Sequence, residues 1–132
     1  MVFLDTNPVV YFVEQPPIWG GIAAARIAGL RAAGEALAVS DLVRMEALVG
    51  PLKATDARLL AEFSTFFTAA NVQVLSITAA VCDRAARIRA QYGFKTLDAL
   101  HLATAVEHGC SRFLTNDAAL KKFPDISVEL IS

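Results

Sequence analysis

Short apolar runs alternate with longer segments of helical periodicity along the whole chain, and this alternation limits the possible folds more than any other feature. Strands that are joined through a helix usually lie parallel, because a tight turn joins antiparallel neighbours. The expected strands cover residues 2–4, 37–39, 72–75 and 112–115, with a further edge strand at 127–131. The sequence therefore predicts an α/β fold in which helices cover both faces of a parallel sheet.

Capping and turn residues set the expected helix boundaries. A short helix or turn at 8–13 is interrupted by Pro16-Pro17, where the ring prevents regular continuation. The other predicted segments are a helix at 22–33 ended by Gly34, a helix capped by Ser40 that stops at Gly50-Pro51, a helix at 55–67, a helix at 78–92 ended by Gly93, a helix capped by Thr96 that runs to about His108, and a helical turn at 117–122.

Length and composition indicate one domain over residues 1–132, with enough apolar residues to fill a core. The hydrophobic fraction of 55% is high for a water-soluble chain, so part of the apolar surface is expected to meet another protein chain. No segment has the length and apolarity of a membrane span or a secretory signal. Cys82 and Cys110 lack metal-type spacing and are interpreted as reduced, buried thiols in a cytoplasmic protein.

Four acidic residues stand where apolar strands end or inside apolar helical segments. Asp5 follows the run 2–4 and Asp117 follows 113–116, while Glu46 and Asp98 lie in apolar helices. The carboxyl ends of parallel strands and the starts of the returning helices meet at one edge of the sheet, so all four can converge there. Carboxylates crowded in this way repel one another and lose hydration unless a cation sits among them. A hard divalent cation with oxygen ligands is the simplest candidate, and it indicates metal-assisted phosphodiester chemistry.

Each acid also has an ordinary structural interpretation. Asp98 suits the first turn of a helix, Asp117 can cap the helical turn that follows it, and Asp5 can form an Asx turn. Glu46 is harder to explain, because it shares the apolar face of its helix and needs a partner there. His101, one turn beyond Asp98, could position a phosphate or a water, but a satisfied and half-buried histidine is the more common outcome.

Together these residues resemble the PIN-domain ribonucleases, in the toxin branch of the VapBC toxin–antitoxin systems. The resemblance spans essentially the whole chain and rests on the order and strand context of several short motifs. They are Leu4-Asp5-Thr6-Asn7, Ser40 with Glu46 in the following helix, Asp98-Ala99-Leu100-His101-Leu102-Ala103, and Leu114-Thr115-Asn116-Asp117. The resemblance implies a three-layer α/β/α sandwich with a central parallel sheet of four to five strands.

The resemblance also implies a function and roles for individual residues. It implies Mg²⁺ or Mn²⁺ held by Asp5, Glu46, Asp98 and Asp117, which would also be the catalytic residues of an endoribonuclease. Second-shell or phosphate-positioning roles are implied for Thr6, Asn7, Ser40 and Thr115. Water attack without a 2′-hydroxyl nucleophile predicts 5′-phosphate and 3′-hydroxyl ends, and the crowded acids are expected to have raised pKa values without metal.

RNA is the expected substrate, a cognate antitoxin the expected inhibitor, and a homodimer the expected assembly. The net charge of −1 argues against avid nonspecific RNA binding and leaves local basic contacts open. Candidate RNA contacts are Arg44, Arg84, Arg87, Arg89 and Lys95. An aromatic set larger than a small core needs could receive an antitoxin helix or form a dimer face; its members are Tyr11, Phe12, Trp19, Phe63, Phe66 and Phe67.

Three alternatives remain open from the sequence alone. A haloacid-dehalogenase-like phosphatase would use Asp5 as a nucleophile, but that class has Asp-x-Asp at the first strand and residue 7 here is Asn. A non-catalytic module could bind RNA or a protein without cleavage. A PIN nuclease could also act in RNA maturation, although the small size of the chain favours a toxin.

Overall fold

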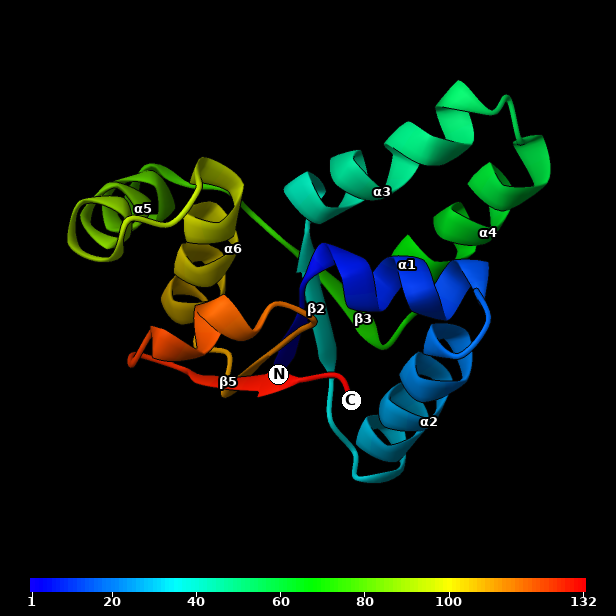
Figure 1. The fold of residues 1–132 in the computed structure, drawn as a ribbon, viewed down its shortest axis with the longest axis horizontal. Coiled ribbons are helices and arrows are strands. Elements are labelled where there is room, and N and C mark those ends of the chain that lie inside the picture. Colours follow the sequence, from blue (N-terminus) through cyan, green and yellow to red (C-terminus); the bar gives the residue numbers. More distant parts are fainter.

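The computed structural model describes residues 1–132 and contains a five-stranded sheet with helices on both sides (Figure 1). The strands are β1 (Val2–Leu4), β2 (Leu37–Ser40), β3 (Val72–Leu75), β4 (Arg112–Thr115) and β5 (Ser127–Leu130). The helices are α1 (Thr6–Glu14), α2 (Trp19–Ala32), α3 (Asp41–Lys53), α4 (Ala57–Phe67), α5 (Ala79–Tyr92), α6 (Thr96–Glu107) and the 3₁₀ helix η1 (Ala118–Lys122).

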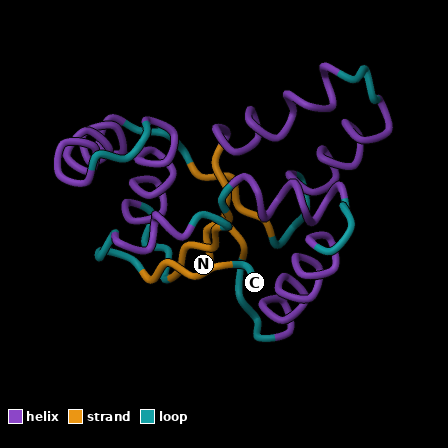
Figure 2. The backbone as a smooth tube through the Cα atoms, viewed as in Figure 1, coloured by secondary structure: helices purple, strands orange, loops and turns teal.

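All neighbouring strands are parallel, and their order is β3-β2-β1-β4-β5. Helices α1 to α4 gather on one side of the sheet, and α5 and α6 lie on the other, so the molecule has three layers (Figures 1 and 2). The predicted α/β/α arrangement is therefore confirmed. After β1 the chain moves to β2 and β3, and after β3 it crosses back to β4 on the opposite side of β1. The connections thus reverse direction between β1 and β4, which is where open parallel sheets form their ligand sites.

Several predicted boundaries are confirmed by specific caps. The hydroxyl of Ser40 accepts the N–H of Val43 at 3.4 Å, and the hydroxyl of Thr78 accepts the N–H of Val81 at 3.2 Å. Gly93 ends α5 in the left-handed region, with φ of 72°, a conformation that costs glycine little because it has no Cβ.

Other boundaries differ from the expectation. Helix α3 does not stop at Gly50-Pro51 but continues to Lys53 with Pro51 inside it. A proline in the last turn removes only one intrahelical hydrogen bond, and here its ring is buried. Thr96 is the first residue of α6, and Lys95 occupies the capping position without a side-chain hydrogen bond.

The core is one continuous cluster of buried apolar side chains between the sheet and both helical layers. Phe63, Phe66 and Phe67 of α4 are all within it and at most 5% exposed, so they are core residues first. Cys110 is buried as predicted, but Cys82 is exposed on α5, which corrects that expectation. No helix is long and apolar enough to cross a bilayer.

Candidate active site

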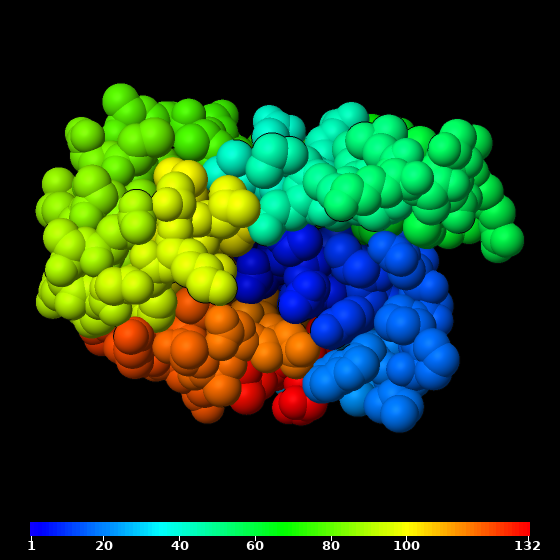
Figure 3. All heavy atoms as spheres, turned by 45° about the horizontal axis from the view of Figure 1, so that its top comes forward, coloured from blue at the N-terminus to red at the C-terminus, as the bar shows by residue number.

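A small polar pocket lies at the carboxyl edge of the sheet, beside the point where the connections reverse. Its volume is about 170 Å³ and none of its lining residues is hydrophobic; they are Asp5, Thr6, Asn7, Glu46, Asp98 and Asp117. The four predicted acids therefore converge as the strand order requires. In Figure 3, the dark blue N-terminal atoms lie in the middle of this face, among the cyan, yellow and orange segments. Four separate parts of the chain thus build the pocket.

Asp5 is held by hydrogen bonds to both of its carboxylate oxygens. The backbone N–H of Thr6 donates to Oδ1 at 2.9 Å, so Asp5 is the N-cap of α1, and the buried hydroxyl of Thr115 donates to Oδ2 at 2.7 Å. The Thr115 oxygen also accepts the N–H of Asp117 at 3.1 Å. Thr115 therefore connects the end of β1 to the loop after β4.

Glu46 is held from two other elements. The Thr6 hydroxyl and the Nε2 atom of His101 lie 2.6 and 2.7 Å from the same oxygen, Oε1. The hydrogen bond with His101 holds the pKa of Glu46 below its ordinary value, and the Thr6 hydroxyl adds to this effect, although burial opposes it. The expectation that all crowded acids have raised pKa values is therefore wrong for Glu46, because two donors offset the lost hydration.

Asp98 shows the opposite behaviour. Burial raises the pKa of its carboxyl, and the negative charges of Asp5, Asp117 and Glu46 raise it further, with only His101 acting against them. Asp98 lies in the first turn of α6, as predicted. Without a cation, burial and the neighbouring carboxylates therefore disfavour its ionised form.

The remaining predicted residues fall into two groups. Asp117 lines the pocket and also caps η1, where its Oδ1 accepts the N–H of Ala119 at 2.9 Å. Asn7 is exposed at the rim. Ser40 is fully buried and is not part of the lining; its hydroxyl caps α3, and it orders the helix that carries Glu46.

His101 is the residue whose position the sequence described least well. It is 1% exposed, so it is fully buried and cannot contact a phosphate from solution. Its Nε2 lies 3.9 Å from Oδ1 of Asp5 in addition to the short contact with Glu46. The spacing of three residues after Asp98 was the available signal, because it places both side chains on one face of α6.

The donor set of the pocket fits a hard divalent cation. Oxygen atoms of four carboxylates, a hydroxyl and an amide surround it, and the pKa of Asp98 is raised by burial and by the negative charges of Asp5, Asp117 and Glu46. No three acidic, histidine or cysteine side chains are close enough together to hold one ion between them. Mg²⁺ keeps several of its waters, so direct contact with one or two carboxylates suffices.

The candidate basic contacts are mostly engaged elsewhere. Arg84 pairs with Glu107 at 2.6 Å, Arg44 lies over the ring of Phe67, and Arg89 donates to the carbonyl of Phe94. Arg87 and Lys95 are exposed, and their side chains make no hydrogen bond or ion pair. Lys95 directly precedes α6, the helix that carries Asp98, and is the better placed of the two.

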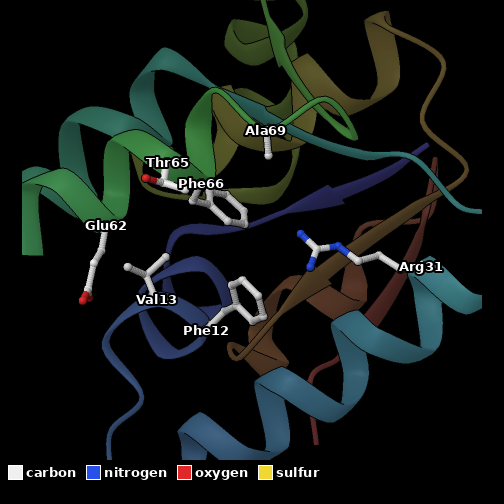
Figure 4. A pocket seen from close by; sticks show the side chains of 7 residues that line it. All are labelled: Phe12, Val13, Arg31, Glu62, Thr65, Phe66 and Ala69. Carbon is white, nitrogen blue, oxygen red and sulfur yellow. The ribbon is translucent and has the colours of Figure 1, made fainter.

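A second and larger hollow, of about 480 Å³, lies away from the acids between α1, α2 and α4 (Figure 4). Four of its seven lining residues are apolar, and the full set is Phe12, Val13, Arg31, Glu62, Thr65, Phe66 and Ala69. The Arg31 guanidinium stands 5.4 Å from the centre of the Phe12 ring, a cation–π arrangement. Phe12 and Phe66 are the members of the predicted aromatic set that face this groove.

Comparison with known proteins gives a family and a set of structural neighbours. The model of the family described as PIN domain matches residues 2–126. No curated protein matches the chain in sequence. A toxin–antitoxin complex from Klebsiella pneumoniae has a TM-score of 0.74 at 22% identity, covering 100% of this chain and 98% of that one. DNA-bound VapBC from Salmonella typhimurium has a TM-score of 0.79 at 19% identity, covering 99% of this chain and 98% of that one.

A third neighbour is VapC20 from Mycobacterium tuberculosis, described as a Sarcin-Ricin loop cleaving toxin. Its TM-score is 0.74 at 16% identity, covering 96% of this chain and 99% of that one. Identities this low establish a shared fold and nothing finer.

Proposed function

The chain belongs to the PIN domain family, and from that premise we propose that it is a Mg²⁺- or Mn²⁺-dependent endoribonuclease that acts as the toxin of a toxin–antitoxin pair. One observation carries the proposal. Asp5, Glu46, Asp98 and Asp117, which come from four parts of the chain, line one polar pocket at the reversal point of the sheet. A purely structural origin explains each acid singly but does not explain why all four meet.

Each acid would have a distinct task in cleavage. Asp5 and Glu46 are already oriented by hydrogen bonds and would hold a cation without reorganising. Asp98 would contribute the charge that most needs neutralising, and Asp117, at the exposed rim, would be nearest to arriving RNA. A bound divalent ion would stabilise negative charge on the phosphoryl oxygens and would make a water easier to deprotonate.

Hydrolysis by water predicts 5′-phosphate and 3′-hydroxyl ends on the cut RNA. Asn7 lines the pocket beside the acids and would donate its amide N–H to a non-bridging phosphate oxygen or its water, whereas the Thr6 hydroxyl already donates to Glu46 and would position that acid. Lys95 would add a cation near the start of α6 for the RNA backbone.

The test is cleavage of total cellular RNA by the purified protein, with Mg²⁺ or with EDTA. Asp98→Asn removes one pocket charge, and Asp83→Asn removes the same charge from an exposed position on α5. Discrete cleavage that requires both metal and Asp98, and is unaffected by Asp83→Asn, would support the proposal. A 2′,3′-cyclic phosphate product would exclude the proposed water attack.

The same experiment separates the alternatives. Metal-independent RNA binding by folded protein with no cleavage would favour a non-catalytic module, and cuts confined to a precursor RNA would favour RNA maturation. The haloacid-dehalogenase-like alternative is not retained, because the family match is to the PIN domain.

A cognate antitoxin is the proposed inhibitor, and the groove between α1, α2 and α4 is its proposed binding surface. Its apolar lining, with Arg31 and Glu62 at the border, suits an amphipathic helix. Thr65→Lys, inside the groove, should weaken inhibition of RNA cleavage by the antitoxin. The matched control is Ala86→Lys, exposed on α5 in the opposite layer. Equal inhibition of both variants would place the antitoxin elsewhere.

A homodimer is also proposed, on a different surface from the one expected. Half of the predicted aromatic set is buried in the core and the other half packs partly buried against it, whereas Met45, Val49 and Leu52 are 51%, 46% and 61% exposed on one face of α3. Sedimentation analysis of the wild type and of Leu52→Lys tests this interface. A monomeric wild type at high concentration would remove it.

A further inference from the structure

A buried imidazole, that of His101, contacts one of the pocket acids without being part of the pocket lining. His101 is 1% exposed and packs beside the ring of Phe3, with ring centres 6.1 Å apart. Its Nε2 lies 2.7 Å from Oε1 of Glu46, whereas its Nδ1 has no hydrogen-bond partner. The ring therefore makes one polar contact within hydrogen-bonding distance, and that contact is with a pocket acid.

The hydrogen-bonding inventory decides which nitrogen carries the proton. An ionised carboxylate only accepts hydrogen bonds, so Nε2 must be the donor. Nε2 therefore carries the proton that Glu46 accepts. Nδ1 has no partner within hydrogen-bonding distance and takes no part in that contact.

The arrangement around Glu46 is asymmetric between its two oxygens. Oε1 accepts from both the Thr6 hydroxyl, at 2.6 Å, and His101, so both of its lone pairs are used. Oε2 receives no hydrogen bond from the protein. Because Glu46 lines the pocket and its side chain is 30% exposed, Oε2 is the oxygen left for an incoming ligand.

We propose that His101 is a positioning residue that fixes Glu46 so that Oε2 alone is offered to the divalent cation. The inference rests on the proposed metal-dependent function and adds a residue that touches neither metal nor RNA. Helix α6 then contributes twice to the pocket: Asp98 supplies a carboxylate, and His101, one turn later, orients a carboxylate of α3. Such outer hydrogen bonds set the orientation and affinity of metal ligands.

Calorimetric titration of the metal-free protein with Mn²⁺ tests the proposal without reference to cleavage. His101→Leu removes the donor and is expected to weaken Mn²⁺ binding by about 10–100-fold, the usual effect of losing such a contact. His101→Gln, whose amide N–H can replace Nε2–H, should recover most of the affinity. The matched control is Thr104→Val, a buried position one turn further along α6 whose hydroxyl bonds the carbonyl of Leu100.

The outcomes distinguish this inference from the function on which it rests. A wild type that binds no Mn²⁺ would overturn the proposed metal dependence itself. A wild type that binds, together with His101→Leu that binds equally well, would overturn only the role of His101. The same weakening in Thr104→Val would also overturn it, because a general loosening of α6 would then explain the effect.

A measurement on the unmodified protein covers the case in which His101→Leu does not fold. Nitrogen-15 NMR correlation of the imidazole ring distinguishes the two tautomers directly. A proton on Nε2 is expected in the metal-free protein and should persist when Mg²⁺ is added. A ring that carries its proton on Nδ1 and none on Nε2 would lack the hydrogen bond to Glu46 and would overturn the proposal.

Discussion

Glu46 and Asp98 face the same pocket from helices in different layers, yet the chain treats their charges in opposite ways. Glu46 receives two hydrogen bonds on one oxygen, and its pKa is lowered. Asp98 receives no side-chain hydrogen bond, and burial and three neighbouring carboxylates raise its pKa. Glu46 is therefore organised before any ligand arrives, whereas the negative charge of Asp98 has no side-chain hydrogen bond to offset its burial. The difference shows that the pocket is partly preorganised and partly destabilised in the same structure.

The largest expected effect is on RNA cleavage, where loss of Glu46 and loss of Asp98 should have similar consequences. Glu46→Gln and Asp98→Asn should each lower kcat/KM by about 10²–10³-fold, the scale of losing one preorganised charge-stabilising group. Asp83→Asn, exposed on α5, is the control for the change in charge. Single-turnover cleavage of a defined RNA measures the effect, and full activity in either pocket variant would remove that acid from the site.

A bound metal ion should offset the unfavourable negative charge of Asp98 and so stabilise the fold. At a Mg²⁺ concentration 100 times Kd, linkage predicts about 2.7 kcal/mol of added stability for the wild type. Asp98→Asn should gain much less, because it lacks the charge that the ion neutralises. Thermal unfolding with Mg²⁺ and with EDTA measures this. An equal gain in both proteins would mean that the ion binds somewhere else.

Thr115 connects the two sides of the pocket, and its loss should affect both. Thr115→Val leaves an oxygen of Asp5 and the N–H of Asp117 without their partner, and should cost about 1–3 kcal/mol in the free energy of unfolding. Thr104→Val is a matched buried control that should cost less, because its hydroxyl only supplements a helical carbonyl. Urea unfolding of both variants compares them, and equal costs would argue against a bridging role.

The smallest expected effect is on the free energy of unfolding without metal, where the changes caused by Asp98→Asn and Glu46→Gln should have opposite signs. The Asp98 pKa is raised above 3.8, so its ionised form destabilises the fold above the folded pKa, and Asp98→Asn should be more stable than the wild type at neutral pH. This advantage should disappear as pH falls through the folded pKa of Asp98.

For Glu46, the sign is reversed. Its pKa is lowered below 4.5, so the ionised form contributes stability above that value and loses it as pH falls through the folded pKa. Glu46→Gln should therefore be less stable than the wild type at neutral pH, with the gap closing in acid. Each difference should stay below about 1 kcal/mol, because solvent screens both groups. Melting curves in EDTA from neutral to acidic pH measure both stability differences. Shifts of the same sign for Asp98→Asn and Glu46→Gln would contradict the comparison.

Much of this arrangement could be predicted from the sequence, because it depends on order and spacing. The alternation of strands and helices predicted the parallel sheet, and the positions of Asp5 and Asp117 after strands predicted their convergence. Local rules failed where tertiary packing decides the outcome. Pro51 remains inside α3 because its ring is buried, and Cys82 is exposed although cysteine is usually buried.

The contact between His101 and Glu46 could not be predicted from spacing along the chain. The two residues are 55 positions apart, and their contact depends on how closely α3 and α6 approach across the end of the sheet. Without that contact, burial alone would predict a raised pKa for Glu46, which is why the expectation for the acids was right for Asp98 and wrong here.

The order of the strands has a consequence for how the protein is made. β1 leaves the ribosome before the other strands of the sheet, and its partner β4, which ends at Thr115 just before Asp117, follows more than a hundred residues later. Until β4 inserts beside β1, Asp5 lacks one of its hydrogen bonds and the pocket lacks its fourth acid. A nascent or partly unfolded chain therefore carries the acids without the site. Long-range strand pairing is slow, so we expect the pocket to be completed only after β4 has paired with β1.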